Sequence, residues 1–316
     1  MPKVLISDTL SPQAVDIFKK AHVEVDVKTG LSEADLIAII GDYDGLAIRS
    51  ATKVNAKVLG AATKLKVVGR AGIGVDNVDL AAATERNVLV MNTPFGNSVT
   101  TAEHAIAMLL ALARQIPHAN VTTQSGKWLK NKYMGVEVTG KTLGIIGCGN
   151  IGSIVADRAQ GLKMSVIAYD PYLTVERASA LNVNKVQLDE LLAKSDFISL
   201  HTPLTAQTRY ILNKETLAQA KQGVRIVNCA RGGLIHEGDL KAALESGHVA
   251  GIALDVFEIE PAKENALFGM EQVIATPHIG ASTWEAQENV ALQVAEQIAA
   301  YLNTGAVVNA VNVIAR

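Results

Sequence analysis

Three residues of chemically useful types lie in the second half of the chain. Arg231, Glu260 and His278 each come shortly after a run that predicts a buried strand. A histidine can accept a proton near neutral pH, a neighbouring carboxylate favours its charged form, and an arginine can clamp a carboxylate through two parallel bonds. In an open parallel sheet the carboxyl ends of the strands form the ligand-binding edge. The three residues could therefore form a hydride-transfer site, although each taken alone could equally be a surface or turn residue.

A glycine-rich turn at residues 147–152 is the second chemical signal. It reads G-C-G-N-I-G between a predicted strand at Thr142–Ile146 and a predicted helix at Ile151–Leu162. A second predicted strand, Ser165–Tyr169, then ends at Asp170. Such a turn lets the pyrophosphate of a dinucleotide approach the backbone and the start of the helix, while the carboxylate binds the ribose hydroxyls. Because that carboxylate repels a 2′-phosphate, the pattern favours NAD over NADP.

The composition excludes several other classes of protein. The chain has 316 residues, a formal charge of −2 and 49% hydrophobic residues, which suits about two globular domains and gives no reason to expect a nucleic-acid partner. There is no long apolar run, so no membrane span is expected. The only two cysteines, Cys148 and Cys229, exclude a disulfide scaffold and a cysteine-rich metal site, and Cys148 is expected to be a small buried filler. We expect a cytoplasmic protein without a signal peptide or a bound metal.

Short apolar runs alternate with helical patterns through the first part of the chain, which predicts a parallel sheet with right-handed crossovers. The predicted strands are Val4–Ile6, Val23–Val27, Leu46–Ile48, Val67–Val68 and Val88–Met91. The predicted helices are Pro12–Ala21, Ser32–Ile40, Asn55–Ala61 and Val78–Glu85.

A break at Thr93–Asn97 is followed by a predicted helix, Thr100–Ala113, whose start fits a capping box of Thr100 with Glu103. A polar stretch at 124–140 precedes a second strand–helix alternation, which runs from 142 to 275. A long final helix, capped by Ser282 with Glu285, leads to a predicted strand at Val307–Val313. We therefore expect two α/β domains with doubly wound parallel sheets, one comprising residues 1–95 and 284–316 and the other residues 96–283.

Four segments resemble the D-isomer-specific 2-hydroxyacid dehydrogenases: Gly69–Asp79, Val227–Gly233, Ala253–Phe257 and Thr276–Ser282. The resemblance extends from about residue 4 to residue 312. It implies two Rossmann-like domains, of which the discontinuous one binds the substrate and the other binds NAD. It also implies that Arg231, Glu260 and His278 are catalytic.

The resemblance further assigns binding residues. The implied cofactor contacts are Ile73, Gly147, Gly149, Asn150, Ile151, Gly152, Asp170, Thr202, Cys229, Ala230, Arg231, Asp255, His278, Gly280 and Ala281. The implied substrate contacts are Arg49, Arg70, Ala71, Gly72, Ile73, Gly74, Asn97, Arg231 and His278. The helix Thr100–Ala113 and the loop Trp128–Met134 would form a homodimer interface. Longer members carry a C-terminal regulatory domain, so we expect this chain, which stops at Arg316, to lack a serine-binding site.

Arg49 and Arg70 favour a phosphorylated substrate, because each follows a predicted strand of the first domain and a phosphate requires cations beyond the carboxylate clamp. Either arginine could instead pair with an acid of its own domain. The favoured reaction is oxidation of 3-phospho-D-glycerate to 3-phosphohydroxypyruvate by NAD, the first step of serine biosynthesis. One alternative is a related enzyme that reduces glyoxylate or hydroxypyruvate or acts on D-lactate. Another is a corepressor-like protein that binds NAD(H) as a sensor.

Overall fold

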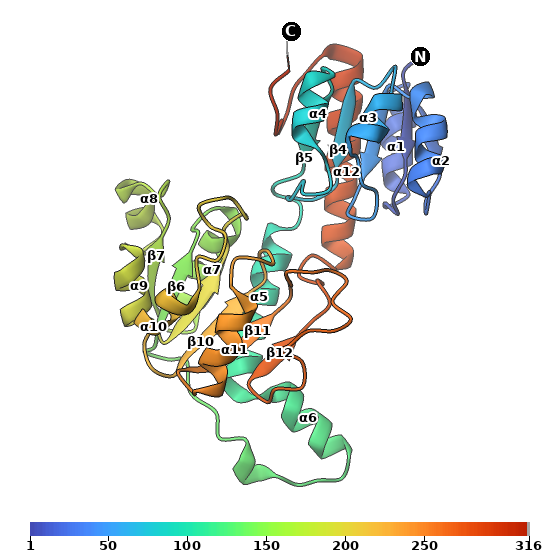
Figure 1. Cartoon of the computed structure of the whole chain (residues 1–316). Coiled ribbons are helices and arrows are strands. Elements are labelled where there is room, and N and C mark those ends of the chain that lie inside the picture. Colours follow the sequence, from blue (N-terminus) through green and yellow to red (C-terminus); the bar gives the residue numbers. More distant parts are fainter. Residues whose placement is uncertain (315–316) are drawn as a thin grey trace. The chain divides into compact units, whose positions relative to one another are not determined.

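The structure is a computed structural model that describes residues 1–314. The chain divides into two compact units (Figure 1). Unit 1 combines Met1–Asn97 with Ser282–Arg316, and unit 2 is Ser98–Ala281. The last two residues of the predicted first domain, 315 and 316, lie outside the described residues. None of the helices within residues 1–314 is long and apolar enough to cross a membrane.

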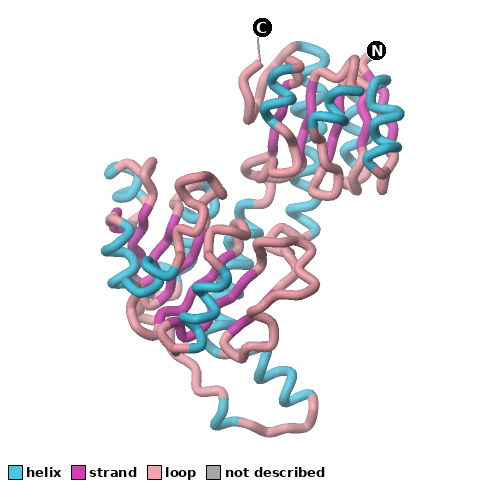
Figure 2. Tube along the Cα trace, viewed as in Figure 1, coloured by secondary structure: helices cyan, strands magenta, loops and turns pink. Residues whose placement is uncertain are grey.

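Unit 1 contains a five-stranded parallel sheet in the order β2-β1-β3-β4-β5, coloured magenta in Figure 2. Its strands are β1 (Lys3–Ile6), β2 (Glu24–Val27), β3 (Gly45–Ile48), β4 (Val67–Arg70) and β5 (Leu89–Asn92). Its helices are α1 (Gln13–Lys20), α2 (Glu33–Ile39), η1 (Ile40–Asp42), α3 (Ala56–Ala61), α4 (Leu80–Glu85) and α12 (Trp284–Thr304). Every strand pairs in parallel with its neighbours, as the strand–helix alternation predicts.

Two helix layers bury the two faces of this sheet. Helices α1 and α12 pack on one face through residues such as Phe18 and Ile298, and the α2–α4 layer covers the other through residues such as Leu36 and Val58. Gly69 in β4 permits the close approach of α12, because a Cβ atom there would lie 2.6 Å from side-chain atoms of Ile298 and Val294. The C-terminal helix therefore completes the core of the N-terminal segment.

Unit 2 contains a seven-stranded parallel sheet in the order β12-β11-β10-β9-β6-β7-β8. Its strands are β6 (Thr142–Ile146), β7 (Ser165–Tyr169), β8 (Asn184–Lys185), β9 (Phe197–Leu200), β10 (Val224–Asn228), β11 (Val249–Leu254) and β12 (Val273–Ala275). Its helices are α5 (Ser98–Arg114), α6 (Ile116–Gln124), η2 (Lys130–Lys132), α7 (Asn150–Gly161), α8 (Val175–Ala180), α9 (Leu188–Lys194), α10 (Lys214–Gln219) and α11 (Glu237–Glu245). The strand order reverses between β6 and β9, and such a switch point creates a ligand-binding crevice at the carboxyl edge.

Residues of α5 and α7, among them Leu109 and Val155, form a core with the strands on one face of this sheet. Residues of α9, α10 and α11, among them Leu191 and Leu240, form a core on the opposite face. The two parallel sheets with helices on both faces confirm the predicted α/β class.

Both predicted capping boxes were wrong. Helix α5 begins at Ser98, so Thr100 lies inside its first turn and does not cap it. Helix α12 is capped by Thr283, whose side chain accepts a hydrogen bond from the Ala286 amide, and not by Ser282. In both cases several hydroxyl residues compete at the helix start, and the path of the preceding chain selects among them.

The predicted strand Val307–Val313 is absent from the structure. This segment joins the edge of the sheet in unit 1 through a single antiparallel bridge between Met91 and Ala310 and through hydrogen bonds to Val90. One of these bonds comes from a side chain, because Asn312 Oδ1 accepts from the Val90 amide at 2.8 Å. Because Asn309 adopts a left-handed conformation with φ 53°, the chain bends there and cannot continue as a strand.

Candidate active site

The glycine-rich turn joins β6 to α7, and at two of its positions steric contacts require glycine. Gly147 has φ 91°, and a Cβ atom there would lie 2.7 Å from the carbonyl oxygen of His201. A Cβ atom at Gly152 would lie 2.1 Å from the carbonyl oxygen of Gly147, so a larger residue would push α7 away from the turn. Gly149 differs, because a Cβ atom there would meet no atom of the described residues within 4 Å.

The open space at Gly149 lies at the start of α7, where no side chain of residues 1–314 caps the helix. The first backbone N–H groups of a helix attract anions, and an uncapped N-terminus leaves them free for a ligand. The turn therefore fits the pyrophosphate of a dinucleotide, whose approach a side chain at Gly149 would obstruct.

Asp170 lies immediately after β7, beside this turn. Its carboxylate accepts hydrogen bonds from the amides of Cys148 and Tyr172, each at 2.8 Å. The neighbouring Cys148 thiol is buried, and burial together with the charge of Asp170 raises its pKa to about 11. Cys148 is therefore a neutral filler, as the sequence predicts, and a carboxylate lies where a dinucleotide would place its ribose.

Asp255, directly after β11, anchors the loop that carries His278. Its side chain is 1% exposed. One oxygen accepts from the hydroxyl of Thr276 at 2.6 Å and from the amide of Ile279 at 2.8 Å, and the other accepts from the amide of Gly280 at 2.7 Å. Burial alone would raise the pKa of this carboxyl, but a hydrogen bond to His104 together with these bonds outweighs burial and holds the pKa below its usual value. An ionised carboxylate thus holds the loop on both sides of His278, through the Thr276 side chain before it and two backbone amides after it.

Sequence reasoning missed a further donor, His104 on α5. Its Nε2 lies 3.4 Å from Oδ1 of Asp255 and 3.4 Å from the hydroxyl of Thr276. Nothing in the local pattern around residue 104 marks this role, because it depends on α5 packing against β11. The one signal for this contact was that His104 lies on a predicted helix, which would pack against the sheet.

Arg231 also lies at the carboxyl edge of the sheet in unit 2, where two loops pack closely against each other. A Cβ atom at Gly232 would lie 1.7 Å from the carbonyl oxygen of Phe257, so only glycine lets the loop after β10 pack against the loop after β11. The Asn228 side chain closes the Arg231 turn by donating to the Arg231 carbonyl at 2.9 Å and accepting from the Ala230 amide at 3.0 Å. The guanidinium donates to the Ala230 carbonyl at 2.7 Å.

His278 and Glu260 form a hydrogen-bonded pair. Nδ1 of His278 lies 2.7 Å from Oε2 of Glu260, whose other oxygen accepts from the amide of Phe257 at 3.0 Å. The hydrogen bond to Glu260 raises the pKa of His278 above its usual value, although burial acts in the opposite direction and the charge of Arg231 lowers it. Burial would raise the pKa of Glu260, but its bonds to His278 and Phe257 hold that pKa below the usual value. The structure therefore brings Arg231, Glu260 and His278 to one edge of unit 2.

His201, the other histidine near this edge, has a different environment. Its Nε2 lies 2.8 Å from the hydroxyl of Ser199, and burial lowers its pKa to about 4. With no carboxylate within 4.0 Å among residues 1–314, it stays neutral and does not match the acid–base arrangement at His278.

The remaining residues of the predicted cofactor set, apart from Ile73, lie at the same carboxyl edge of unit 2, in the segments that follow β6, β9, β10 and β12. They are Asn150, Ile151, Thr202, Cys229, Ala230, Gly280 and Ala281. Ile73 lies in unit 1, in the turn after β4.

Arg49 and Arg70 lie together in unit 1, at the carboxyl ends of the adjacent strands β3 and β4. Ile48 pairs with Arg70 in the sheet, so Arg49 comes one residue beyond this pair. The Arg49 amide donates to Asp8 at 2.6 Å, and its side chain bonds to Gln287 of α12. Arg70 lies over Gly72, which has φ 139° and leaves room for the guanidinium. The predicted substrate loop, Ala71 to Gly74, follows directly, and Asn97 is the last residue of the N-terminal segment of unit 1.

Comparison with known proteins identifies the class of protein that this fold and site define. The chain belongs to the D-isomer specific 2-hydroxyacid dehydrogenases, whose NAD binding domain matches residues 106–280. The match confirms the predicted family and the predicted cofactor, NAD.

The curated relatives have names that specify one enzyme within this family. The chain is 50% identical over 298 residues to D-3-phosphoglycerate dehydrogenase of Synechocystis sp., covering 94% of this chain and 54% of that protein. It is 51% identical over 312 residues to D-3-phosphoglycerate dehydrogenase of Rattus norvegicus, covering 98% of this chain and 58% of that protein. The chain therefore spans little more than half the length of these curated relatives.

Solved structures share the fold over nearly the whole chain. A glyoxylate reductase from Paecilomyes thermophila superimposes with a TM-score of 0.90 at 31% identity, covering 98% of both chains. The apo D-lactate dehydrogenase from Escherichia coli gives a TM-score of 0.85 at 29% identity, covering 98% of this chain and 100% of the other.

Substitution of Gly152 should affect stability, whereas substitution of Gly149 should affect the affinity for NAD. Gly152→Ala should lower the free energy of unfolding by about 3 kcal/mol, because its methyl group overlaps a backbone oxygen. Gly149→Ala should cost at most about 1 kcal/mol, yet should raise the Kd for NAD at least tenfold, because its methyl group occupies the path of the pyrophosphate. Chemical denaturation and titration with NAD measure the two effects. Wild-type affinity for NAD in Gly149→Ala would contradict this model of binding.

Proposed function

We propose that this chain oxidises 3-phospho-D-glycerate to 3-phosphohydroxypyruvate with NAD, the first step of serine biosynthesis. The observation that carries the proposal is the pair Arg49 and Arg70 at one sheet edge of unit 1, in a chain about 50% identical to proteins named D-3-phosphoglycerate dehydrogenase. We assign unit 1 to substrate binding and unit 2 to NAD binding.

His278 is proposed as the general base. Because Glu260 occupies Nδ1, the Nε2 atom of the imidazole is left to face the substrate. The proton of the C2 hydroxyl passes to neutral His278, and the Glu260 carboxylate stabilises the imidazolium that forms. Arg231 holds the substrate carboxylate and polarises the developing carbonyl oxygen. NAD, when bound, accepts the hydride that leaves C2.

The phosphate group is assigned to unit 1. A 2-hydroxy acid needs one clamp for its carboxylate, whereas a phosphate carries nearly two further charges. Burial lowers the pKa of Arg49 although the charge of Asp8 opposes this effect, which means that its guanidinium is partly removed from water. A partly desolvated arginine binds an anion more strongly than one in bulk water.

A second candidate is a dehydrogenase of the same family that acts on an unphosphorylated acid. The close superposition on a glyoxylate reductase and on a D-lactate dehydrogenase favours this alternative. The two candidates share the Arg231–Glu260–His278 arrangement and differ in whether the substrate requires Arg49 and Arg70.

We also infer a cytoplasmic homodimer. Helix α6 and the segment that follows it extend away from the sheet of unit 2, as Figure 1 shows in green. Large apolar side chains lie exposed along this arm, with Val121 at 66%, Trp128 at 83% and Met134 at 80%. Exposed apolar side chains gathered on one segment are typical of a surface that a partner covers.

The cofactor preference should depend on the charge of Asp170. The unmodified chain should use NAD with a much higher kcat/KM than NADP, because the carboxylate would face the 2′-phosphate. Asp170→Asn keeps a hydrogen-bond acceptor but removes the charge, and it should lower the NAD-to-NADP ratio of kcat/KM at least about tenfold, by analogy with the cost of burying an unpaired charge. Absorbance of the reduced nicotinamide measures both rates. Equal use of NAD and NADP by the unmodified chain would refute this role.

The phosphate preference should depend on Arg49 and Arg70. Arg70→Gln removes a charge-assisted contact worth roughly 1.5–3 kcal/mol, so kcat/KM for phosphoglycerate should fall about tenfold or more. Activity on D-glycerate or D-lactate should change less, and Arg49→Gln should behave in the same way. Arg86→Gln, at the end of α4 in the same unit, is the matched control and should leave both activities unchanged. Equal losses on phosphorylated and unphosphorylated substrates would favour the alternative function.

A further inference from the structure

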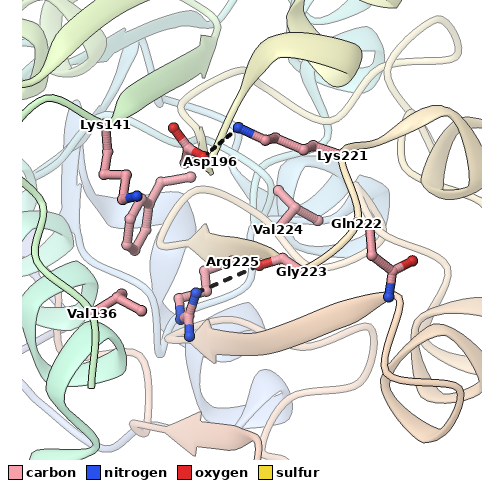
Figure 3. Close-up of a pocket in the computed structure, with 9 residues that line it drawn as sticks. Val136, Lys141, Asp196, Lys221, Gln222, Gly223, Val224 and Arg225 are labelled. Carbon is pink, nitrogen blue, oxygen red and sulfur yellow. Dashed lines mark hydrogen bonds and ion pairs between the residues drawn. The ribbon is translucent and has the colours of Figure 1, made fainter. Parts of the chain in front are cut away.

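A small pocket of about 80 Å³ lies at the amino edge of the sheet in unit 2, the edge opposite Arg231 and His278. Three segments that lie immediately before or at the start of β6, β9 and β10 line it, together with Val136 (Figure 3). Its charged side chains are Lys141, Asp196, Lys221 and Arg225. None of them belongs to the proposed catalytic or NAD-binding set.

The single carboxylate of this pocket already has partners. Asp196 accepts from Nζ of Lys221 at 2.7 Å and from the amide of Thr142 at 2.9 Å. Burial would raise the pKa of Asp196, but these bonds and the nearby charge of Lys141 hold its pKa below the usual value. Lys221 and Asp196 therefore compensate each other, and the charges of Lys141 and Arg225 remain.

Arg225 is half-buried, and its guanidinium has few polar partners. Within the described part of the chain its guanidinium makes one long hydrogen bond, to the Gly223 carbonyl at 3.5 Å, and lies 5.9 Å from the centre of the Phe197 ring. Among residues 1–314, no carboxylate oxygen lies within 4.0 Å of the charged nitrogens of Arg225 or Lys141. Burial lowers the pKa of Arg225. A cation partly removed from water without an anionic partner costs free energy that a bound anion would recover.

Several neighbouring backbone and amide donors are already bonded to carbonyl groups. The Gly223 amide donates to the His248 carbonyl, the Arg225 amide to the Asp196 carbonyl, and the Gln222 side chain to the Gly247 carbonyl. Among the described residues, Lys141 and Arg225 are the cationic side chains of this pocket that no carboxylate pairs. Figure 3 shows both of them directed toward the same side of the pocket, with Val136 beside them.

We propose that this pocket binds one phosphate group, held by the planar fork of Arg225 and the ammonium group of Lys141. Arginine provides two parallel N–H donors that match two phosphate oxygens, and lysine adds a point charge. The volume of about 80 Å³ equals that of roughly two to three water molecules, which suits a single phosphate and leaves the rest of a phosphorylated metabolite outside. The phosphate is either the free ion or a monoester.

The test is a titration of the full chain with inorganic phosphate at constant ionic strength, balanced with sodium chloride, and followed by backbone amide NMR shifts. Saturable shifts are expected at Phe197 and Arg225. The amides of Arg231 and Gly280 report separately on any phosphate bound at the opposite edge. A parallel titration with glycerol 3-phosphate distinguishes free phosphate from a phosphate monoester. If the pocket serves a monoester, glycerol 3-phosphate should bind more tightly than inorganic phosphate. If it serves the free ion, glycerol 3-phosphate should bind no more tightly.

Two variants and one control decide the assignment. Arg225→Gln and Lys141→Gln should each raise the apparent Kd at Phe197 at least about tenfold, as expected for the loss of a charge-assisted contact. Arg158→Gln, on the exposed surface of α7, should leave it unchanged. Lys141→Gln changes a side chain at the pocket rim, so it remains informative if Arg225→Gln proves unstable in thermal denaturation. The proposal is overturned by shifts that do not saturate, by equal shifts with chloride alone, or by variants that bind as the unmodified chain does.

Discussion

A carboxylate that is removed from water stays ionised only where hydrogen-bond donors replace the lost solvent. Asp255 meets this condition through Thr276, the amides of Ile279 and Gly280, and His104 on α5. Because those amides belong to the loop that carries His278, the ionised state of one buried group fixes the position of the proposed base. The arrangement also couples α5, on one face of the sheet, to the chemistry proposed at its edge.

Close approaches of the backbone place the other groups of the site. The loop with Arg231 can lie against the loop that leads to Glu260 because Gly232 has no side chain to collide with Phe257. At His278, the two carboxylates of Glu260 and Asp255 favour the imidazolium, whereas Arg231 disfavours it. The balance raises the pKa of His278, which suits a base that must hold a proton after taking it from an alcohol.

Much of the fold could be predicted from the sequence, because strands buried on both faces form short aliphatic runs whose positions coincide with the observed strands, as Thr142–Ile146 and Ser165–Tyr169 do. Helix caps could not, because hydroxyl residues compete for them, as Ser282 and Thr283 do before α12. The Val307–Val313 segment was mispredicted because apolar alternation does not reveal the bend at Asn309. The contact of His104 with Asp255 and the cationic pocket at Arg225 join residues far apart in the chain, and no local pattern signals either.

The central claim is that the Glu260–His278 pair moves the proton during oxidation, and its most direct test is the dependence of kcat/KM for phosphoglycerate oxidation on pH. Oxidation requires neutral His278, so the rate should rise with pH through one ionisation that lies above the value of about 6.5 for unperturbed histidine. Because the hydrogen bond to Glu260 raises the pKa of His278, Glu260→Gln should move this ionisation to lower pH. A rate limb that stays in the same place in Glu260→Gln, or a rate independent of pH in the unmodified chain, would contradict the account.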